Sequence, residues 1–280
     1  MMGLWSKLTG SQLTKNYELD KEPYMQAGLH TIWKVYRARK RDRNNMDVSV
    51  FIFEKKQIEK KKYSQGQKDE IFTILKKDPQ NLAKLRHPGL LSLIEQPQED
   101  NKLIVFVTEP VEYNLASLMM DSSMGEFIPS ELETKCIVLE LLEALNFVHA
   151  TAKTIHANIC PENIYLTKEG KVKLAGFNFS MQFSQQESLP IAFSYDLRIN
   201  EVALVPNLKF APPELTNEKT KLASIQGDIF SVGCVVFYMI AINQRGGGMN
   251  KSPFLINIGD PTDLITHKNE CNMLGKRMSQ

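Results

Sequence analysis

The chain of 280 residues has little cysteine and tryptophan and no long hydrophobic run. Its longest apolar stretch, residues 229–242, is interrupted by Ser231 and Gly233 and is short for a membrane span, so we expect a buried core helix there. The cysteines are too far apart for a zinc knuckle or a redox pair, and we expect reduced, mostly buried thiols. They are Cys136, Cys160, Cys234 and Cys271.

Other absences limit the possible classes of function. Residues 1–10 contain no long apolar run after a basic region, so no secretory signal is visible. A formal net charge of +2 gives no reason to expect nucleic-acid binding. With 42% hydrophobic and 24% charged residues, the composition is typical of a folded cytoplasmic protein of one large domain or two lobes.

The most informative residue is Asn158. Residues 156–163 read H-A-N-I-C-P-E-N, which follows the kinase catalytic-loop pattern H-R-D-x-x-x-x-N with Asn158 at the aspartate position. That aspartate accepts the proton of the substrate hydroxyl group. An amide has no ionisable carboxylate, so Asn158 cannot serve as this general base.

Two further positions lack groups that phosphoryl transfer uses. Residues 48–51 match V-A-I-K, and Phe51 replaces the lysine that would hold the α- and β-phosphates, although it can also be ordinary strand core. Residues 176–178 match D-F-G, and Gly176 has no side chain to bind magnesium. We therefore interpret Phe51, Asn158 and Gly176 as degenerate positions and predict no catalytic and no metal-binding residue.

Three other polar residues have plainer roles. Asn163 offers one weak carbonyl ligand, but we favour a role in ordering the loop by hydrogen bonds. Cys160 replaces a lysine and has no His–Asp pair to activate it, so we expect a packing cysteine. Asp78 lies near the spacing of the acid that would pair with the missing lysine, and we expect it to have nothing to pair with.

The phosphate-binding loop and the hinge keep only part of their pattern. In the Gly-rich loop Gly28 alone survives, because His30 and Trp33 replace the other glycines and block a close backbone approach to phosphate. Together with Val35 of the following strand and Asn163, Gly28 counts as a vestigial site residue.

Residues 108–111 look like a gatekeeper and hinge. The peptide groups of Glu109 and Val111 keep the ability to bond an adenine, because Pro110 removes a donor that the usual contact does not use. Weak ATP binding without magnesium therefore stays an alternative, although no cofactor is required.

The order and spacing of these motifs resemble the protein kinases over most of the chain. Within them, the chain most resembles the SCY-like pseudokinases, and in particular the branch linked to clathrin-coated vesicles. This resemblance is carried by residues 50–56, 85–88, 108–111 and 156–163. It implies an α+β, bilobed protein kinase-like fold with a strand-rich small lobe and a helical large lobe.

The resemblance also implies limits for the domains. We expect an N-terminal extension at residues 1–16, the small lobe at 17–108, the hinge at 109–113 and the large lobe at 114–280. The last helices of a complete kinase lobe and the helical repeats and clathrin-binding tail of the family are not visible in the sequence. We therefore expect a large lobe that is truncated at its C-terminus.

The function implied by the resemblance is a non-catalytic scaffold or adaptor in clathrin-linked vesicle trafficking. The implied partners are proteins of the clathrin and adaptor machinery, and the implied location is cytoplasmic, peripheral to vesicle, endosome or Golgi membranes. One rival function is an atypical Ser/Thr kinase, which would need a base and a metal ligand from elsewhere, with Asp196 or Glu201 as the speculative sources. The other rival is an ATP-binding switch without phosphotransfer.

Two stretches, residues 37–43 and 55–62, are rich in lysine and arginine. Such clusters bind anionic lipid head groups, so an anionic membrane surface is an alternative partner. Acids such as Glu54 and Asp69 balance these charges, and we favour a solvated face over lipid or nucleic acid.

Local patterns predict several elements. Residues 32–38 and 48–53 alternate and form a hairpin. A charged helical region follows, and Asp78 looks like an N-cap at which a helix restarts. A capping box at residues 130–133 opens a helix with one apolar stripe, formed by Ile137, Leu141, Leu145 and Val148.

Overall fold

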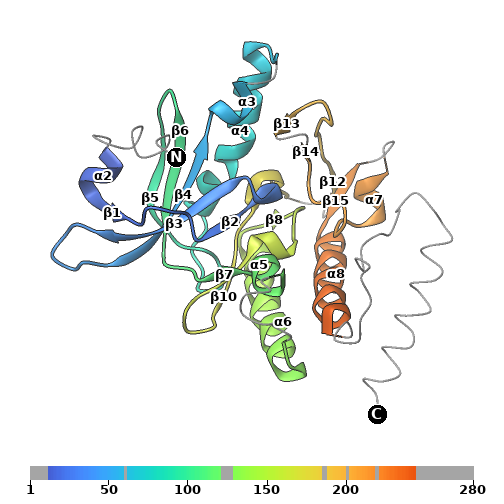
Figure 1. The fold of residues 1–280 in the computed structure, drawn as a ribbon. Helices are drawn as coiled ribbons and strands as arrows, with labels where there is room; N and C mark the ends of the chain where they lie inside the picture. The colour runs from blue at the N-terminus through green and yellow to red at the C-terminus, as the bar shows by residue number, and fades with distance from the viewer. Residues whose placement is uncertain are drawn as a thin grey trace.

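The computed structural model describes residues 12–59, 62–120, 129–184, 188–199, 202–217 and 221–243. Most of the expected N-terminal extension, the tail after Asn243 and Glu201 lie outside these residues. Figure 1 shows a strand-rich N-terminal part joined to a helical C-terminal part, which agrees with the expected α+β, two-lobed arrangement.

The small lobe is built on a six-stranded antiparallel sheet. Its central order is β1-β3-β4-β6-β5, and β2 pairs with β3. The expected hairpin is confirmed as β3 and β4, with Val35 opposite Phe51. The strands are β1 (Tyr17–Leu19), β2 (Met25–Ala27), β3 (Trp33–Lys40), β4 (Asp47–Glu54), β5 (Leu93–Glu99) and β6 (Leu103–Thr108).

Side chains of β4 alternate between two apolar clusters because successive residues of a strand point to opposite faces. Val48, Val50 and Ile52 join an outer cluster that also contains Leu13 of α2 (Gln12–Asn16). Phe51 and Phe53 belong to the main core, which continues into the large lobe. The inner face of the sheet is therefore the one that contacts the large lobe.

A single helix, α4 (Gln65–Leu82), follows the short helix α3 (Lys56–Glu59). Ser64 caps α4 by accepting the N–H of Gln67. The predicted helix restart at Asp78 is wrong, because α4 runs through Pro79 without a break. Asp78 is not a surface cap but lies buried, and its carboxylate accepts the N–H of Gly176, far along the chain.

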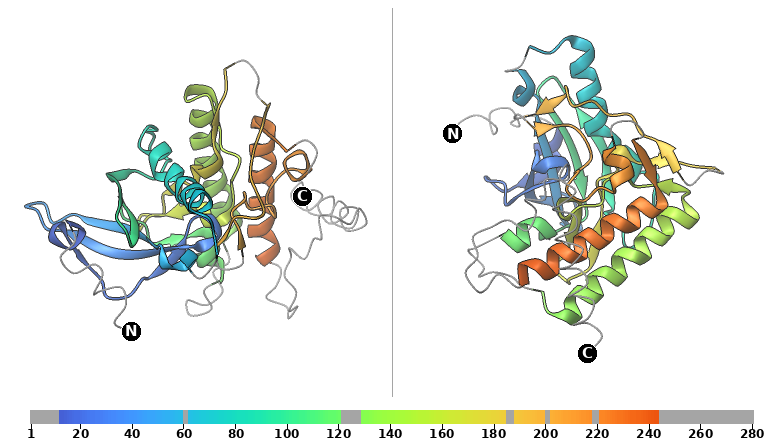
Figure 2. Two further views of the ribbon diagram at one scale, coloured as in Figure 1. Left: turned by 90° about the horizontal axis from the view of Figure 1, so that it is seen from above. Right: turned by 90° about the vertical axis from the view of Figure 1, so that its right-hand side faces the viewer.

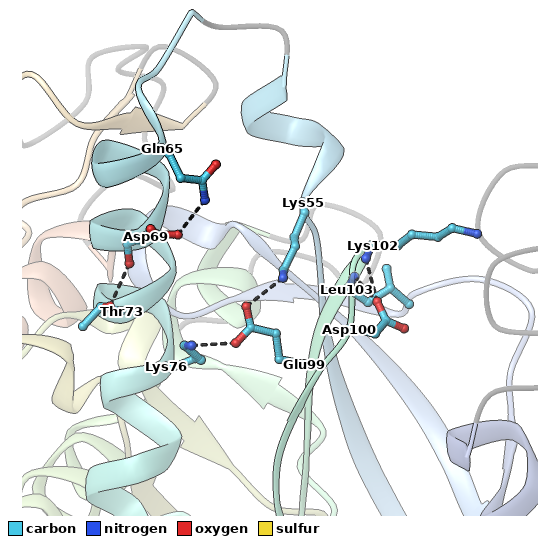
Figure 3. A network of polar contacts seen from close by, with 9 residues as sticks. All are labelled: Lys55, Gln65, Asp69, Thr73, Lys76, Glu99, Asp100, Lys102 and Leu103. Atoms are coloured by element: carbon cyan, nitrogen blue, oxygen red, sulfur yellow. Dashed lines mark hydrogen bonds and ion pairs between the residues drawn. The ribbon is translucent and has the colours of Figure 1, made fainter.

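Figure 3 shows a polar network between α4 and the sheet. Glu99 of β5 binds Lys55 at 2.7 Å and Lys76 of α4 at 2.6 Å. Lys56 of the second basic stretch and Lys34 of β3 both bind the buried Glu54. Although burial raises the pKa of Glu54, hydrogen bonds from the two lysines lower it to about 2. Several of these cations are thus neutralised within the small lobe.

The large lobe is mainly helical, with short two- and three-stranded sheets (Figure 1). Its helices are α5 (Leu115–Met120), α6 (Glu131–Asn146), the π-helix η3 (Phe147–Thr151), the 3-10 helices η4 (Pro161–Asn163) and η5 (Phe177–Phe179), α7 (Pro213–Thr216) and α8 (Ile225–Asn243). Its strands are β7 (Tyr113–Asn114), β8 (Thr154–Ile155), β9 (Ile164–Leu166), β10 (Val172–Leu174), β11 (Met181–Gln182), β12 (Ser188–Pro190), β13 (Arg198–Ile199), β14 (Val202–Ala203) and β15 (Leu222–Ser224).

The helices α6 and α8 lie side by side (Figure 2). The predicted capping box of α6 is confirmed, since Ser130 Oγ accepts the N–H of Glu133 and Glu133 binds Ser130 N in return. The predicted apolar stripe is buried in the core. The apolar region at residues 229–242 forms most of α8, but Ile229 and Phe230 in its first turns are exposed. Across the described residues, the helices are too short or too polar to cross a bilayer.

The stability of the large lobe can be tested with two leucines of α6. Leu141 is 1% exposed, whereas Leu139 of the same helix is 59% exposed. We expect Leu141→Ala to lower the free energy of unfolding by about 2–5 kcal/mol, because it leaves a cavity in the core. Leu139→Ala makes the same chemical change at the surface and should cost less than about 0.5 kcal/mol. Equal losses in urea unfolding would contradict this placement of α6.

Candidate functional site

Phe51, at the expected lysine position, packs within an aromatic cluster. Its ring stacks on Phe106 of β6, with centroids 4.6 Å apart, and meets Tyr165 of β9 edge-on at 5.8 Å. Trp33 meets Phe106 edge-on, with ring centroids 4.9 Å apart. Phe51 is 1% exposed. The position where a lysine ammonium would bind phosphates is therefore apolar and buried, and it contacts the large lobe through Tyr165.

The hinge peptide groups bind other parts of the chain. The N–H of Val111 donates to Ser49 Oγ at 3.0 Å, and its carbonyl accepts the hydroxyl of Tyr24 at 2.6 Å. The Tyr24 and Ser49 hydroxyls lie 3.0 Å apart. Burial raises the pKa of Tyr24 to about 12, so its hydroxyl keeps the proton that it donates. Both polar groups of Val111 are thus engaged without a ligand.

The peptide groups of Glu109, the other hinge residue, also bond within the chain. The carbonyl of Glu109 accepts the hydroxyl of Thr108 at 2.9 Å, and the Glu109 N–H donates to the carbonyl of Ser92. Sequence reasoning missed the role of Ser49. The signal was present in V-S-V-F, because serine carries a hydroxyl group where the alanine of V-A-I-K has only a methyl group.

The residues of the former Gly-rich loop fold onto the large lobe. Gly28 has a φ of 68° and donates its N–H to the carbonyl of Glu162 at 3.3 Å. The next residues form the 3-10 helix η1 (Leu29–Thr31), in which Leu29 is buried. His30 Nε2 lies 2.9 Å from the carbonyl of Val205, and burial lowers the pKa of its imidazole.

Two N–H groups of this loop donate to carbonyl groups of the loop itself, so they are not available to a phosphate. Thr31 N donates to Gly28 O at 2.8 Å, and Ile32 N donates to Leu29 O at 3.4 Å. A side chain at position 28 would also meet Trp33, since a built Cβ lies 2.6 Å from its Cδ1 atom. The indole of Trp33 thus occupies the space beside the surviving glycine.

The catalytic-like loop is held by Asp228 of α8. The carboxylate accepts the N–H groups of His156 and Ala157, each at 2.8 Å, and lies 2.8 Å from His149 Nε2. Asn158 follows in this loop, and its Oδ1 accepts the N–H of Asn207 at 2.9 Å. The Asn158 Nδ2 group is buried and has no hydrogen-bond partner among the described residues.

Asn163 and Gly176 lie against each other. Asn163 Nδ2 donates to the carbonyl of Asn158 at 2.9 Å and contacts Cys160 Sγ at 3.2 Å, so it orders the loop. A Cβ atom on Gly176 would lie 2.2 Å from Asn163 Cγ. The side chain of Asn163 therefore fills the space that an aspartate at position 176 would enter. Cys160 is buried, and burial raises the pKa of its thiol.

Asp78 does have partners, contrary to the expectation from the sequence. Its Oδ1 accepts the N–H of Gly176 at 2.9 Å and that of Phe177 at 2.8 Å. Burial raises the pKa of this carboxyl to about 6, against the lowering effect of the two amide hydrogen bonds. The sequence indicated that the lysine partner of an acid at this position is missing, but it could not show that backbone amides bind Asp78 instead.

The speculative bases of the atypical-kinase alternative are not brought to the loop in the described structure. Asp196 is exposed, and its Oδ2 lies 3.5 Å from Ser194 Oγ of its own segment. Glu201 lies outside the described residues. Asn158 is contacted instead by Asn207, whose side-chain amide binds Glu162.

Comparisons with known proteins agree with the motif order. The protein kinase domain family model matches residues 29–258. SCY1-like protein 2 of Homo sapiens is 31% identical over 245 residues, an alignment that covers 83% of this chain and 26% of the relative. Protein kinase domain-containing protein ppk32 of Schizosaccharomyces pombe is 32% identical, with 82% of this chain and 32% of the relative covered. The chain spans about a quarter to a third of the length of these relatives.

Gly170 and Gly176 have similar φ angles, so alanine substitutions at the two positions distinguish a steric clash at position 176 from backbone strain. Gly176 has a φ of 89° and Gly170 a φ of 77°, but a Cβ at Gly170 would meet nothing within 4 Å. Gly170→Ala should cost about 1–2 kcal/mol, the penalty for a left-handed conformation. Gly176→Ala should cost roughly 1–3 kcal/mol more, because Asn163 must move and break its bonds within the loop. Chemical denaturation measures both, and equal losses would show that Asn163 does not occupy this space.

Proposed function

Because the chain belongs to the protein kinase domain family, we propose that it is a kinase-like domain that lacks phosphotransferase activity and works as a scaffold or adaptor. The observation that carries this proposal is that the groups that would face a nucleotide already contact other parts of the chain. Phe51 is buried in an aromatic stack, and Val111 is bonded to Ser49 and Tyr24. Each of the positions where a kinase would hold its nucleotide is engaged by the chain itself.

The chemistry of phosphoryl transfer supports the same proposal. The reaction depends on positioning and on charge neutralisation by metal ions and cations, with a carboxylate to orient the attacking hydroxyl. Asn158 supplies an amide whose oxygen already accepts the N–H of Asn207. Gly176 supplies no metal ligand, and a larger residue there would strike Asn163. The residues present do not fit a magnesium–nucleotide complex.

We further propose that nucleotide binding is not part of the function. An adenine would have to displace the Ser49 hydroxyl from Val111, which exchanges one hydrogen bond for another without net gain. Phosphates would meet Phe51 and the folded loop around Leu29 instead of cations and free N–H groups. An ATP-binding switch would need this loop to open first.

The cellular setting is proposed from the family resemblance. We propose that the domain recruits protein partners of the clathrin and adaptor machinery at the cytoplasmic surface of vesicle, endosome or Golgi membranes. The ion pairs of the basic stretches support protein partners over direct lipid binding, because Arg37, Lys55 and Lys56 are already paired with Glu112, Glu99 and Glu54. Because the clathrin-binding tail of the family is not visible in this sequence, binding has to come from the kinase-like domain itself, and purified adaptor complexes should be retained on the immobilised chain at physiological salt. A catalytically active kinase domain that retains them equally would contradict the proposal.

Purified chain should transfer no phosphate from labelled ATP to a generic protein acceptor above background. ATP should leave its melting temperature unchanged, and magnesium should add no shift, because Gly176 lacks the ligand that couples metal to phosphate. Turnover that survives removal of contaminating kinases would favour the atypical-kinase alternative. A shift with ATP alone, without turnover, would favour the nucleotide switch.

Restoring the three family residues should not restore a kinase. We expect Phe51→Lys, Asn158→Asp and Gly176→Asp combined to melt earlier than the parent and to remain inactive. The lysine would place an unpaired ammonium within an aromatic stack, and a buried charge without a partner is costly. The single variant Asn158→Asp serves for comparison, because it adds the carboxylate at nearly the same volume without placing a lysine in the aromatic stack. A triple variant as stable as the parent and active on a peptide would show that these motifs are misplaced.

A further inference from the structure

A pocket of about 620 Å³ lies on the small lobe, between the end of α4, the connection at residues 83–88 and the first half of β5. Its apolar wall includes Leu85, Leu93 and Ile94. Leu85 and Leu93 pack against the main core, and Ile94 packs against the outer cluster that contains Leu13. The pocket therefore opens where the two apolar clusters of the small lobe approach each other, and it is large enough to hold a bulky side chain.

The polar groups of this pocket are a free cation and an engaged acid. Arg86 is exposed, and its guanidinium makes no hydrogen bond or ion pair within the part of the chain that the structure describes. Glu95 accepts the hydroxyl of Tyr17 at 2.6 Å and the side-chain amide of Gln98 at 3.2 Å. A carboxylate has acceptor capacity beyond two donors, so Glu95 has room for one more.

This combination fits the side chain of a tryptophan. An indole has an apolar body for the wall of the pocket and a single N–H donor that requires an acceptor when buried. Its ring face attracts a cation, and among the aromatic side chains it does so most strongly. A free guanidinium beside an apolar wall therefore favours tryptophan over an aliphatic residue.

The N-terminal part of the chain enters the described structure beside the pocket. Tyr17 bonds to Glu95, and Leu13 shares the outer cluster with Ile94. Residues 1–11 precede this point, and they contain Trp5 and no acid. Trp5 lies eight residues before Leu13. A chain of that length reaches up to about 26–29 Å when extended, which is enough to bring Trp5 to the pocket.

We propose that the pocket beside β5 is an internal docking site for residues 1–11, with the indole of Trp5 against Arg86 and the apolar wall. Because the segment is tethered next to the pocket, its effective concentration there is in the millimolar range. It therefore outcompetes a second copy of the chain or a partner peptide of the same intrinsic affinity. A protein that uses this pocket must first displace Trp5. The docking stands whether or not the proposed scaffold function holds.

Tryptophan fluorescence of the full chain tests the docking, because the chain has only two tryptophans, Trp5 and Trp33. The spectrum of the parent minus that of Trp5→Phe isolates the emission of Trp5 and leaves the buried Trp33 unchanged. We expect this emission to be blue-shifted and to be quenched by acrylamide several-fold less than in urea, independently of protein concentration. Trp5 that is quenched as freely as in urea would overturn the proposal, and protection that is lost on dilution would assign the pocket to a second copy.

Variants of the pocket locate the contact. Arg86→Gln should lower the equilibrium constant for docking about two- to fivefold, as expected for the loss of a cation–π contact. Lys84→Gln is the matched control, because Lys84 is an exposed cation two residues away that does not line the pocket, and it should leave the quenching unchanged. Ala83→Phe places a ring in the pocket and should expose Trp5. Protection of Trp5 that survives Ala83→Phe, or equal effects of Arg86→Gln and Lys84→Gln, would show that Trp5 does not bind here.

Discussion

The aromatic contact of Phe51 with Phe106 and Tyr165 is the interaction on which the joining of the two lobes depends. Two of these rings come from the small-lobe sheet, and Tyr165 comes from β9 of the large lobe. Aromatic pairs in such stacked and edge-on geometries contribute about 0.5–1.5 kcal/mol each beyond the area they bury. The lobes therefore adhere through the chain's own side chains at the place where relatives with a lysine would hold a charged ligand.

The polar groups around this stack follow a common rule, since a buried donor or acceptor requires a partner. The hinge N–H of Val111 finds Ser49, and the amide of Gly28 finds the carbonyl of Glu162. The carboxylate of Asp78 finds two backbone amides in place of an ammonium. Each replacement is small in sequence terms, and together they pair these polar groups within the chain.

How far the sequence could predict this arrangement depended on the range of each interaction. The β3–β4 hairpin, the capping box at Ser130 and the apolar stripe of α6 are local patterns, and the structure confirms them. The same alternation placed Phe51 on a strand, and it lies on β4. The partner of Asp78 could not be predicted, since the amides that it binds lie 98 and 99 residues further along the chain. The local sequence pattern predicted an N-cap at Asp78, because it could not show that tertiary packing buries this residue within α4.

The unpartnered polar groups of the site carry a consequence for how this protein tolerates sequence change. Trp33 Nε1, Asn158 Nδ2, Asn163 Oδ1 and Asn178 Oδ1 are buried without a hydrogen-bond partner among the described residues. Each such group typically lowers stability by about 1–3 kcal/mol relative to an apolar group of the same shape. These atoms are accordingly a stability cost that the fold carries in this region, and a substitution that gives one of them a partner should stabilise the protein.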